Sequence, residues 1–113
     1  MVPDTVINVK RLDEAAELPV YVDDEVAGAD VRSMMTYTLK PGERKLFPTG
    51  LAMEIPMGWE IQVRPRSGLA LKNGITVLNT PGTIDSSYLG QIGVVLINHS
   101  EEPFPVARGD RIA

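Results

Sequence analysis

A carboxylate and an aromatic ring follow a proline–glycine turn in the segment Asn79–Gln91. Pro81 fixes φ for the second position of a turn, and Gly82 accepts the positive φ that a type II turn needs next, so the segment predicts a tight hairpin. Asp85 comes just past the second strand of that hairpin, and Tyr88 stands three residues later. A rigid hairpin with open backbone groups, an acid and a ring is typical of a small-molecule pocket. An ordinary hairpin with a capping aspartate and a half-buried tyrosine fits the same residues.

Two arginines and a hydroxyl gather at the start of a short expected helix. Arg64 and Arg66 precede Ser67, which can cap a helix whose first turn is Gly68–Leu71. Gly74 can end that helix in the left-handed conformation. Guanidinium groups, a hydroxyl and the free N–H groups of a helix start together favour binding of a phosphate or another anion. A capped helical turn with solvated arginines is the alternative, and the residues alone leave both open.

The elements that must position these groups are short strands. No window keeps an apolar 3.6-residue period for more than about two turns, and Leu12–Leu18 is expected to be a turn or an irregular segment. Gly93–Asn98 is predicted to be buried on both faces because its run is apolar, and Pro41-Gly42 predicts a further type II turn. About ten short strands separated by turns predict a single all-β sandwich or barrel. The expected strands are Val6–Val9, Tyr37–Leu39, Arg44–Phe47, Leu51–Ile55, Trp59–Arg64, Ile75–Leu78, Thr83–Ile84, Gly93–Asn98 and Phe104–Ala107, together with a strand that begins at Asp30.

Composition and charge limit the function classes. A chain of 113 residues fits one domain over residues 1–113. The absence of cysteine and the single histidine, His99, leave no thiolate site, no histidine cluster for zinc and no histidine-dependent triad. The net charge of −4 disfavours direct nucleic-acid binding, which needs a broad basic face. Ile92–Ile97 is far shorter than a membrane span of ~20 residues. Met1–Arg11 lacks the apolar block of a signal peptide, so a cytoplasmic protein without membrane contact is expected.

Four segments stand in an order and spacing that resemble the signature motifs of the trimeric dUTPases. They are Ala27–Val31, Pro65–Ala70, Asn79–Gln91 and Arg108–Ala113. The resemblance runs over nearly the whole chain and implies a jelly-roll β-barrel subunit of a homotrimer. It also implies hydrolysis of dUTP to dUMP and pyrophosphate with Mg²⁺, at active sites that lie between subunits.

The resemblance implies a role for each residue that matches a motif. Asp85 matches the general base, which would direct a water at the α-phosphorus. Tyr88 matches the ring that packs under the deoxyribose and leaves no room for a 2′-hydroxyl. Asn79 and the hairpin backbone match the uracil site, and Gln91 closes the same loop. The hairpin backbone of that site comprises Gly82, Thr83 and Ile84.

The remaining roles concern the phosphates. Arg66, Ser67 and Gly68 match the phosphate cradle of the family. Asp30 matches an acidic position that would contact Mg²⁺ through water only, because in this family the ion is held mostly by phosphates and water. Arg108 and Asp110 resemble structural positions near the subunit interface.

Two alternatives accompany the assignment. A dCTP deaminase shares the fold, but it would need a glutamate in the base pocket, and no matching segment carries one. The family pattern continues past Ala113 with a glutamine and a flexible glycine-rich tail that bears an arginine and a phenylalanine. If the chain ends at Ala113, weak turnover or a non-catalytic nucleotide-binding trimer is expected, because the segment that closes over the nucleotide would be absent.

Overall fold

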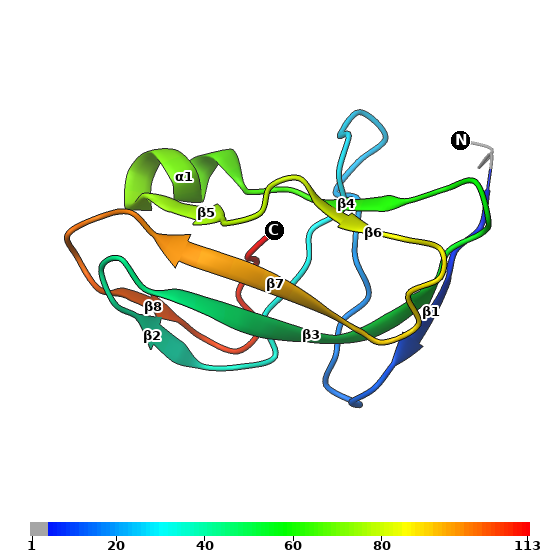
Figure 1. The fold of residues 1–113 in the computed structure, drawn as a ribbon, viewed down its shortest axis with the longest axis horizontal. Helices are drawn as coiled ribbons and strands as arrows, with labels where there is room; N and C mark the ends of the chain where they lie inside the picture. The colour runs from blue at the N-terminus through cyan, green and yellow to red at the C-terminus, as the bar shows by residue number, and fades with distance from the viewer. Residues whose placement is uncertain (1–4) are drawn as a thin grey trace.

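Short antiparallel strands surround a two-part core in the computed structural model, which describes residues 5–113 (Figure 1). The all-β prediction is confirmed, since the helix in the described part of the chain, α1, spans only Ser67–Asn73. Residues 1–4 belong to the Met1–Arg11 segment, which the sequence predicts not to be a signal peptide, and they lie outside the described residues. The strands are β1 (Asn8–Arg11), β2 (Tyr37–Leu39), β3 (Arg44–Glu54), β4 (Ile61–Val63), β5 (Ile75–Val77), β6 (Gly82–Ile84), β7 (Gln91–Asn98) and β8 (Phe104–Val106).

The longest strand, β3, organises the sheet. Four strands pair in the order β1-β3-β7-β5, and two further pairs, β2-β8 and β4-β6, complete the described sheets. The register between β3 and β7 shifts between Pro48 and Ala52, and Gly50 adopts φ 70° inside this bulge. The bulge lets one strand continue where the sequence predicted two, Arg44–Phe47 and Leu51–Ile55, because a bulge bends a strand without ending it.

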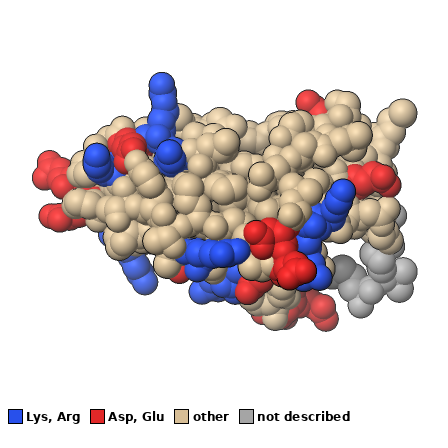
Figure 2. Space-filling view, turned by 90° about the horizontal axis from the view of Figure 1, so that it is seen from below, with Lys and Arg blue, Asp and Glu red and all other residues tan. Residues whose placement is uncertain are grey.

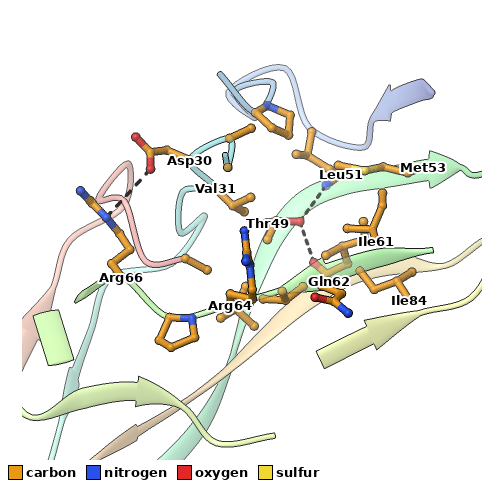
Figure 3. Close-up of a pocket in the computed structure, with 18 of the residues that line it drawn as sticks. Asp30, Val31, Thr49, Leu51, Met53, Ile61, Gln62, Arg64, Arg66 and Ile84 are labelled. Atoms are coloured by element: carbon orange, nitrogen blue, oxygen red, sulfur yellow. Dashed lines mark hydrogen bonds and ion pairs between the residues drawn. The ribbon is translucent and has the colours of Figure 1, made fainter. Parts of the chain in front are cut away.

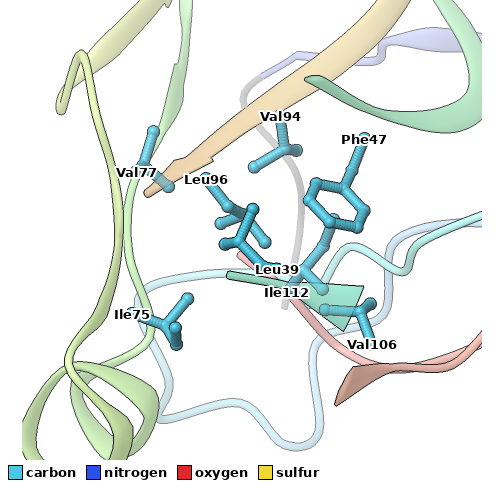
Figure 4. Packing of buried hydrophobic residues seen from close by; sticks show 8 residues of the cluster. All are labelled: Leu39, Phe47, Ile75, Val77, Val94, Leu96, Val106 and Ile112. Carbon is cyan, nitrogen blue, oxygen red and sulfur yellow. The ribbon is translucent and has the colours of Figure 1, made fainter. Parts of the chain in front are cut away.

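The first part of the core forms where side chains of the four-stranded sheet meet those of the β2-β8 pair (Figure 4). All of its members are nearly inaccessible to solvent, so burial of their apolar surface is the main stabilising term for this half of the fold. The cluster comprises Leu39, Phe47, Ile75, Val77, Val94, Leu96, Val106 and Ile112.

The second part of the core lies under the β4-β6 pair, where Leu51, Met53 and Ile92 pack with Ile61 and Ile84. Every second residue of strand β7 is buried, and these residues contribute to both parts of the core. The alternating residues of the strand, apart from the exposed Gln91, are only half-buried. The prediction of a strand buried on both faces is therefore wrong. An antiparallel sheet can cover one face with core and leave the other partly open.

The expected hairpin at Asn79–Gln91 is not formed. Strand β5 pairs with β7, whereas β6 pairs with β4, so the strands on either side of Pro81 belong to different sheets. The Thr80–Pro81 peptide bond is cis, and Gly82 does not have the positive φ of a type II turn. Gly82 instead pairs with Val63 as the first residue of β6, which requires an extended backbone.

Other local predictions can be checked at single residues. Gly42 has φ 76° in the turn where Glu43 N–H donates to the Lys40 carbonyl at 3.0 Å, as the Pro-Gly pair predicted. Gly74, with φ 66°, ends α1 as expected. Ser67 does not cap the helix, because the N-cap position falls on Arg66, which makes no side-chain capping bond. The segment Leu12–Leu18 forms neither a helix nor a strand and consists of turns and irregular backbone, as predicted.

Basic and acidic side chains are interspersed over the face of the molecule in Figure 2. This mixture accords with the net charge of −4. Within residues 5–113, no helix has the length and apolar character needed to cross a membrane. The cytoplasmic location stays a prediction from the sequence.

Candidate functional site

A pocket of about 330 Å³, called here the smaller pocket, opens between the loop after β6 and strands β3 and β7. It brings together every residue that the sequence assigned to the base, the sugar and the attacking water. These residues are Asn79, Gly82, Thr83, Ile84, Asp85, Tyr88 and Gln91.

Asp85 follows the last residue of β6, where Ile84 pairs with Ile61. Its side chain is exposed and, within residues 5–113, makes no hydrogen bond or ion pair. Its backbone carbonyl accepts the Tyr88 N–H at 3.0 Å, which closes a turn between the acid and the ring. The carboxylate is therefore open to a water or a ligand in the pocket, and carboxylate oxygens accept hydrogen bonds from water.

The ring of Tyr88 is held by the loop that follows it. The Tyr88 hydroxyl donates to the backbone carbonyl of Gln91 at 2.6 Å. A Cβ on Gly90 would lie 2.8 Å from the same hydroxyl oxygen, so a side chain there would displace the ring from this position. The side-chain carbonyl of Gln91 accepts the Gly50 N–H at 2.9 Å and ties the loop to the bulge of β3.

Asn79 lies over the start of β6. An ideal Cβ on Gly82 would come within 3.2 Å of Asn79 Nδ2 and 3.5 Å of Oδ1, so the missing side chain makes room for the amide. The amide offers two N–H donors and a carbonyl acceptor at one wall of the smaller pocket. Such a group can pair with the edge of a planar heterocycle.

A second cavity of about 700 Å³, called here the larger pocket, is ionic at one end and apolar at the other (Figure 3). Asp30 and Arg66 face each other at the ionic end, and Leu51, Met53 and Ile84 gather at the apolar end. All four residues assigned to phosphate and metal lie along this pocket, namely Asp30, Arg66, Ser67 and Gly68.

Asp30 holds two guanidinium groups in place. Its Oδ1 lies 4.0 Å from Arg66 Nε, and its Oδ2 accepts a hydrogen bond of 3.4 Å from Arg111 Nη1. The Asp30 side chain is only 27% exposed. Partial burial strengthens the attraction between these charges relative to bulk water.

A single chain keeps the two groups of site residues apart. In the antiparallel β4-β6 pair, Val63 lies opposite Gly82 and Ile61 lies opposite Ile84. Asp85 therefore extends from one end of the pair, and Arg66 with its neighbours extends from the other. The acid opens on the smaller pocket and the arginine on the larger one.

The sequence missed part of the wall of the smaller pocket. Leu46 and Pro48 of β3 and Gly93 and Val95 of β7 line it. No local signal marks them, because nothing in the sequence around them links them to the loop after β6. Only the bulged pairing of β3 with β7 brings them to the loop after β6.

The larger pocket suits a metal ion only in company with a ligand. Within residues 5–113 no group of three or more Asp, Glu, His or Cys side chains could hold a metal. Two acids, Asp30 and Glu60, line the pocket, and Asp30 is paired with arginines. Mg²⁺ commonly binds through one or two carboxylates, waters and substrate phosphates, so this donor set fits an ion delivered with a polyphosphate.

Comparisons with known proteins agree on one family. Residues 14–113 match the profile of dUTPase. The chain is 57% identical over 107 residues to the deoxyuridine 5'-triphosphate nucleotidohydrolase of Nautilia profundicola, covering 95% of this chain and 75% of that protein. It is 56% identical over 110 residues to the protein of the same name from Anaeromyxobacter sp. (strain Fw109-5), again covering 95% and 75%.

Solved structures show the same architecture. A mutant dUTPase of phage 80alpha aligns with a TM-score of 0.90 at 25% identity, covering 98% of this chain and 81% of that one. Another mutant of the 80alpha enzyme, solved with dUpNHpp, aligns with a TM-score of 0.88 at 25% identity, covering 96% and 79%.

Proposed function

This chain belongs to the dUTPase family and hydrolyses dUTP to dUMP, and from that premise we propose that Asp85 is the general base of the reaction. Its carboxylate takes a proton from a water that attacks the α-phosphorus. A bond forms between that water oxygen and the α-phosphorus, and the bond from the α-phosphorus to the bridging oxygen breaks. Pyrophosphate leaves with the electron pair of the broken bond. A base in this position contributes roughly 10²–10⁴ in rate.

One observation carries the assignment of Asp85. The carboxylate is exposed to the smaller pocket and is engaged by no other side chain of residues 5–113. A structural aspartate would be expected to cap a turn or pair with a cation, as Asp110 does when Oδ2 accepts the Ala107 N–H at 2.9 Å. An acid kept free at the mouth of a pocket suits a proton acceptor better than a tie within the fold.

The rest of the smaller pocket would bind the nucleoside. The Asn79 amide and the backbone of Gly82–Ile84 would meet the polar edge of uracil. The Tyr88 ring, fixed by its bond to the Gln91 carbonyl, would lie against the deoxyribose and oppose a 2′-hydroxyl. Gln91 supports this arrangement through its bond to Gly50 more than through contact with the nucleotide.

The larger pocket would bind the phosphates. Arg66 would neutralise phosphate charge while Asp30 orients its guanidinium, and Ser67 and Gly68 would contribute hydroxyl and backbone donors. Mg²⁺, bound with the substrate, would supply further charge neutralisation at the phosphate oxygens, with Asp30 contacting its waters.

A homotrimer would reunite the two halves of the site. One chain places Asp85 and Arg66 at opposite ends of β4-β6 and on different pockets. A neighbouring copy could present its larger pocket to the smaller pocket of the first chain. Three copies related by rotation would then form three equal sites.

A dCTP deaminase is not favoured, because the family profile and the named relatives are those of dUTP hydrolysis. A binding protein without turnover would also leave Asp85 without a role.

An isotope experiment tests the chemical proposal. Hydrolysis of dUTP in H₂¹⁸O should place the label in the phosphate of dUMP, and label in pyrophosphate would contradict attack at the α-phosphorus. Asp85→Asn should lower kcat by roughly 10²–10⁴ with little change in KM. Asp24→Asn, at an exposed acid outside both pockets, is the matched control and should keep the full rate. Undiminished turnover by Asp85→Asn would refute the role of Asp85.

A further inference from the structure

Arg64 is a second arginine of the larger pocket, and the motif that assigns Arg66, Ser67 and Gly68 gives it no role. It follows β4 directly and lines the same cavity as Arg66. Figure 3 shows its side chain extending into the pocket, between the ionic end at Asp30 and the apolar end at Ile84.

The backbone explains why the two guanidinium groups share a cavity. Arg66 has φ −87° and ψ 125°, and Pro65 restricts its own φ to a similar value. The chain from Arg64 to Arg66 is therefore extended. Residues separated by two positions in an extended chain point to the same side.

The charges of the pocket leave Arg64 available for a ligand. Asp30 is already engaged by Arg66 at 4.0 Å and Arg111 at 3.4 Å. Glu60 is the other acid on the wall, but four residues of extended chain, roughly 13 Å, separate it from Arg64. Across residues 5–113, Arg64 makes no ion pair.

The guanidinium of Arg64 is exposed and lies beside the segment before Asp30. An ideal Cβ on Gly28 would lie 3.8 Å from Arg64 Nη2, which is an ordinary van der Waals distance, so this segment passes close to the group. An exposed cation that makes no ion pair within residues 5–113 is available to an anionic ligand.

We propose that Arg64 binds the triphosphate chain of dUTP as a second guanidinium beside Arg66. It thereby favours the triphosphate substrate over the monophosphate product. This inference rests on the proposed function, since it takes the larger pocket as the phosphate site. Arg64 is a binding residue and takes no part in proton transfer, so its loss should raise KM and leave kcat nearly unchanged.

Direct binding measurements test the proposal independently of turnover. Arg64→Gln should weaken binding of the analogue dUpNHpp about tenfold, the scale of one charge-assisted hydrogen bond, and change dUMP binding less than about twofold. Arg64→Lys should recover part of the loss, because it restores the charge without the planar fork. Arg44→Gln, at an exposed arginine outside both pockets, loses the same charge and should bind both ligands normally.

Two results would overturn the proposal. One is unchanged dUpNHpp affinity in Arg64→Gln, and the other is an equal loss for dUpNHpp and dUMP. If the glutamine variant does not fold, the Arg64 Nε–H resonance of the wild-type protein decides, because it should shift with dUpNHpp and stay fixed with dUMP. Failure of the proposed function is distinguishable, since it would appear as full activity in Asp85→Asn or as ¹⁸O in pyrophosphate.

Discussion

Asp30 and Arg66 face each other at the ionic end of the larger pocket, with 4.0 Å between Oδ1 and Nε, although Asp30 belongs to an early loop and Arg66 follows β4. Arg111, near the end of the chain, contacts the other carboxylate oxygen at 3.4 Å. Three distant segments thus meet at one acid. The isolated bridges Val20–Asp30 and Arg32–Arg111 hold the backbone at Asp30 itself and two residues after it.

Asp30→Asn should weaken the binding of the Mg²⁺ that supports turnover. The neutral amide would leave two guanidinium groups without their carboxylate and would attract the waters of the ion less strongly. We expect the Mg²⁺ concentration for half-maximal dUTP hydrolysis to rise by about 10–100-fold, as for other outer-shell partners of metal ions. A titration with MgCl₂ measures this, and an unchanged half-maximal concentration would remove Asp30 from the metal's surroundings.

Tyr88→Ala should reduce discrimination between dUTP and UTP. Removal of the ring opens the space that a 2′-hydroxyl would occupy, so the ratio of kcat/KM for dUTP to that for UTP should fall by about tenfold or more. Tyr88→Phe is the control, because it keeps the ring and loses only the hydrogen bond to Gln91.

Gly90→Ala tests the same ring from the opposite side. The new Cβ would stand 2.8 Å from the Tyr88 hydroxyl oxygen and would displace it. Discrimination against UTP should therefore fall without any change to Tyr88 itself. Selectivity equal to wild type in both Gly90→Ala and Tyr88→Ala would show that the ring does not exclude ribose.

Gly50→Ala should destabilise the fold through the β3 bulge. The new Cβ would lie 2.9 Å from Ala16 Cβ and from Met34 Cγ, at a φ of 70° that disfavours side chains. Gly42→Ala, with φ 76° and open space around it, carries the conformational cost alone. Gly50→Ala should lose ~1–3 kcal/mol more than Gly42→Ala in free energy of unfolding by urea. Equal losses would mean that Ala16 and Met34 move aside without a cost in stability.

The Tyr37–Glu43 pair predicts a pH-dependent contribution to stability away from both pockets. The Tyr37 hydroxyl donates to Glu43 Oε2, and this bond raises the pKa of Tyr37 above its usual 10.0 and lowers the pKa of Glu43 below its usual 4.5. A carboxyl group whose pKa is lowered by folding stabilises the fold above its unfolded pKa. It loses that effect as the pH falls through its folded pKa. A tyrosine whose pKa is raised by folding stabilises the fold below its unfolded pKa. It loses that effect as the pH rises through its folded pKa.

Tyr37→Phe should therefore lower Tm most between about pH 5 and pH 9, and less on either side. The phenylalanine ring keeps the edge-on contact with Phe47 and the position under Lys45 Nζ, which lies 4.9 Å from the ring centroid, so the comparison isolates the hydroxyl. Thermal unfolding of both proteins across this pH range measures the difference. A difference independent of pH would contradict the charge-assisted bond.

Local conformation was predictable wherever neighbouring residues decide it. The turn at Gly42 and the end of α1 at Gly74 depend on a backbone that only glycine adopts easily, and both occur as expected. Ser67 fails as a cap because a one-residue difference in the helix start moves the N-cap to Arg66. A hydroxyl near a helix start cannot by itself set that boundary.

Strand pairing was not predictable in the same way. Ile75–Val77 and Gly82–Ile84 have the composition of a hairpin, but each reaches lower free energy by covering a different part of the core, beside β7 and β4. The apolar run of β7 likewise concealed its alternation, because its half-buried residues are also aliphatic. Burial against distant strands outweighs the local preference for a tight turn.

The residue types and their order alone determined which chemistry this protein has available: an acid after a Pro-Gly pair, a ring three residues later, arginines beside a serine, and a motif order that identifies the family. The tertiary structure decided which of these groups meet. Antiparallel pairing of β4 with β6 sends Asp85 and Arg66 to opposite ends of the pair, because the chain leaves the two strands of an antiparallel pair in opposite directions, and Asp85 lines the smaller pocket whereas Arg66 lines the larger one.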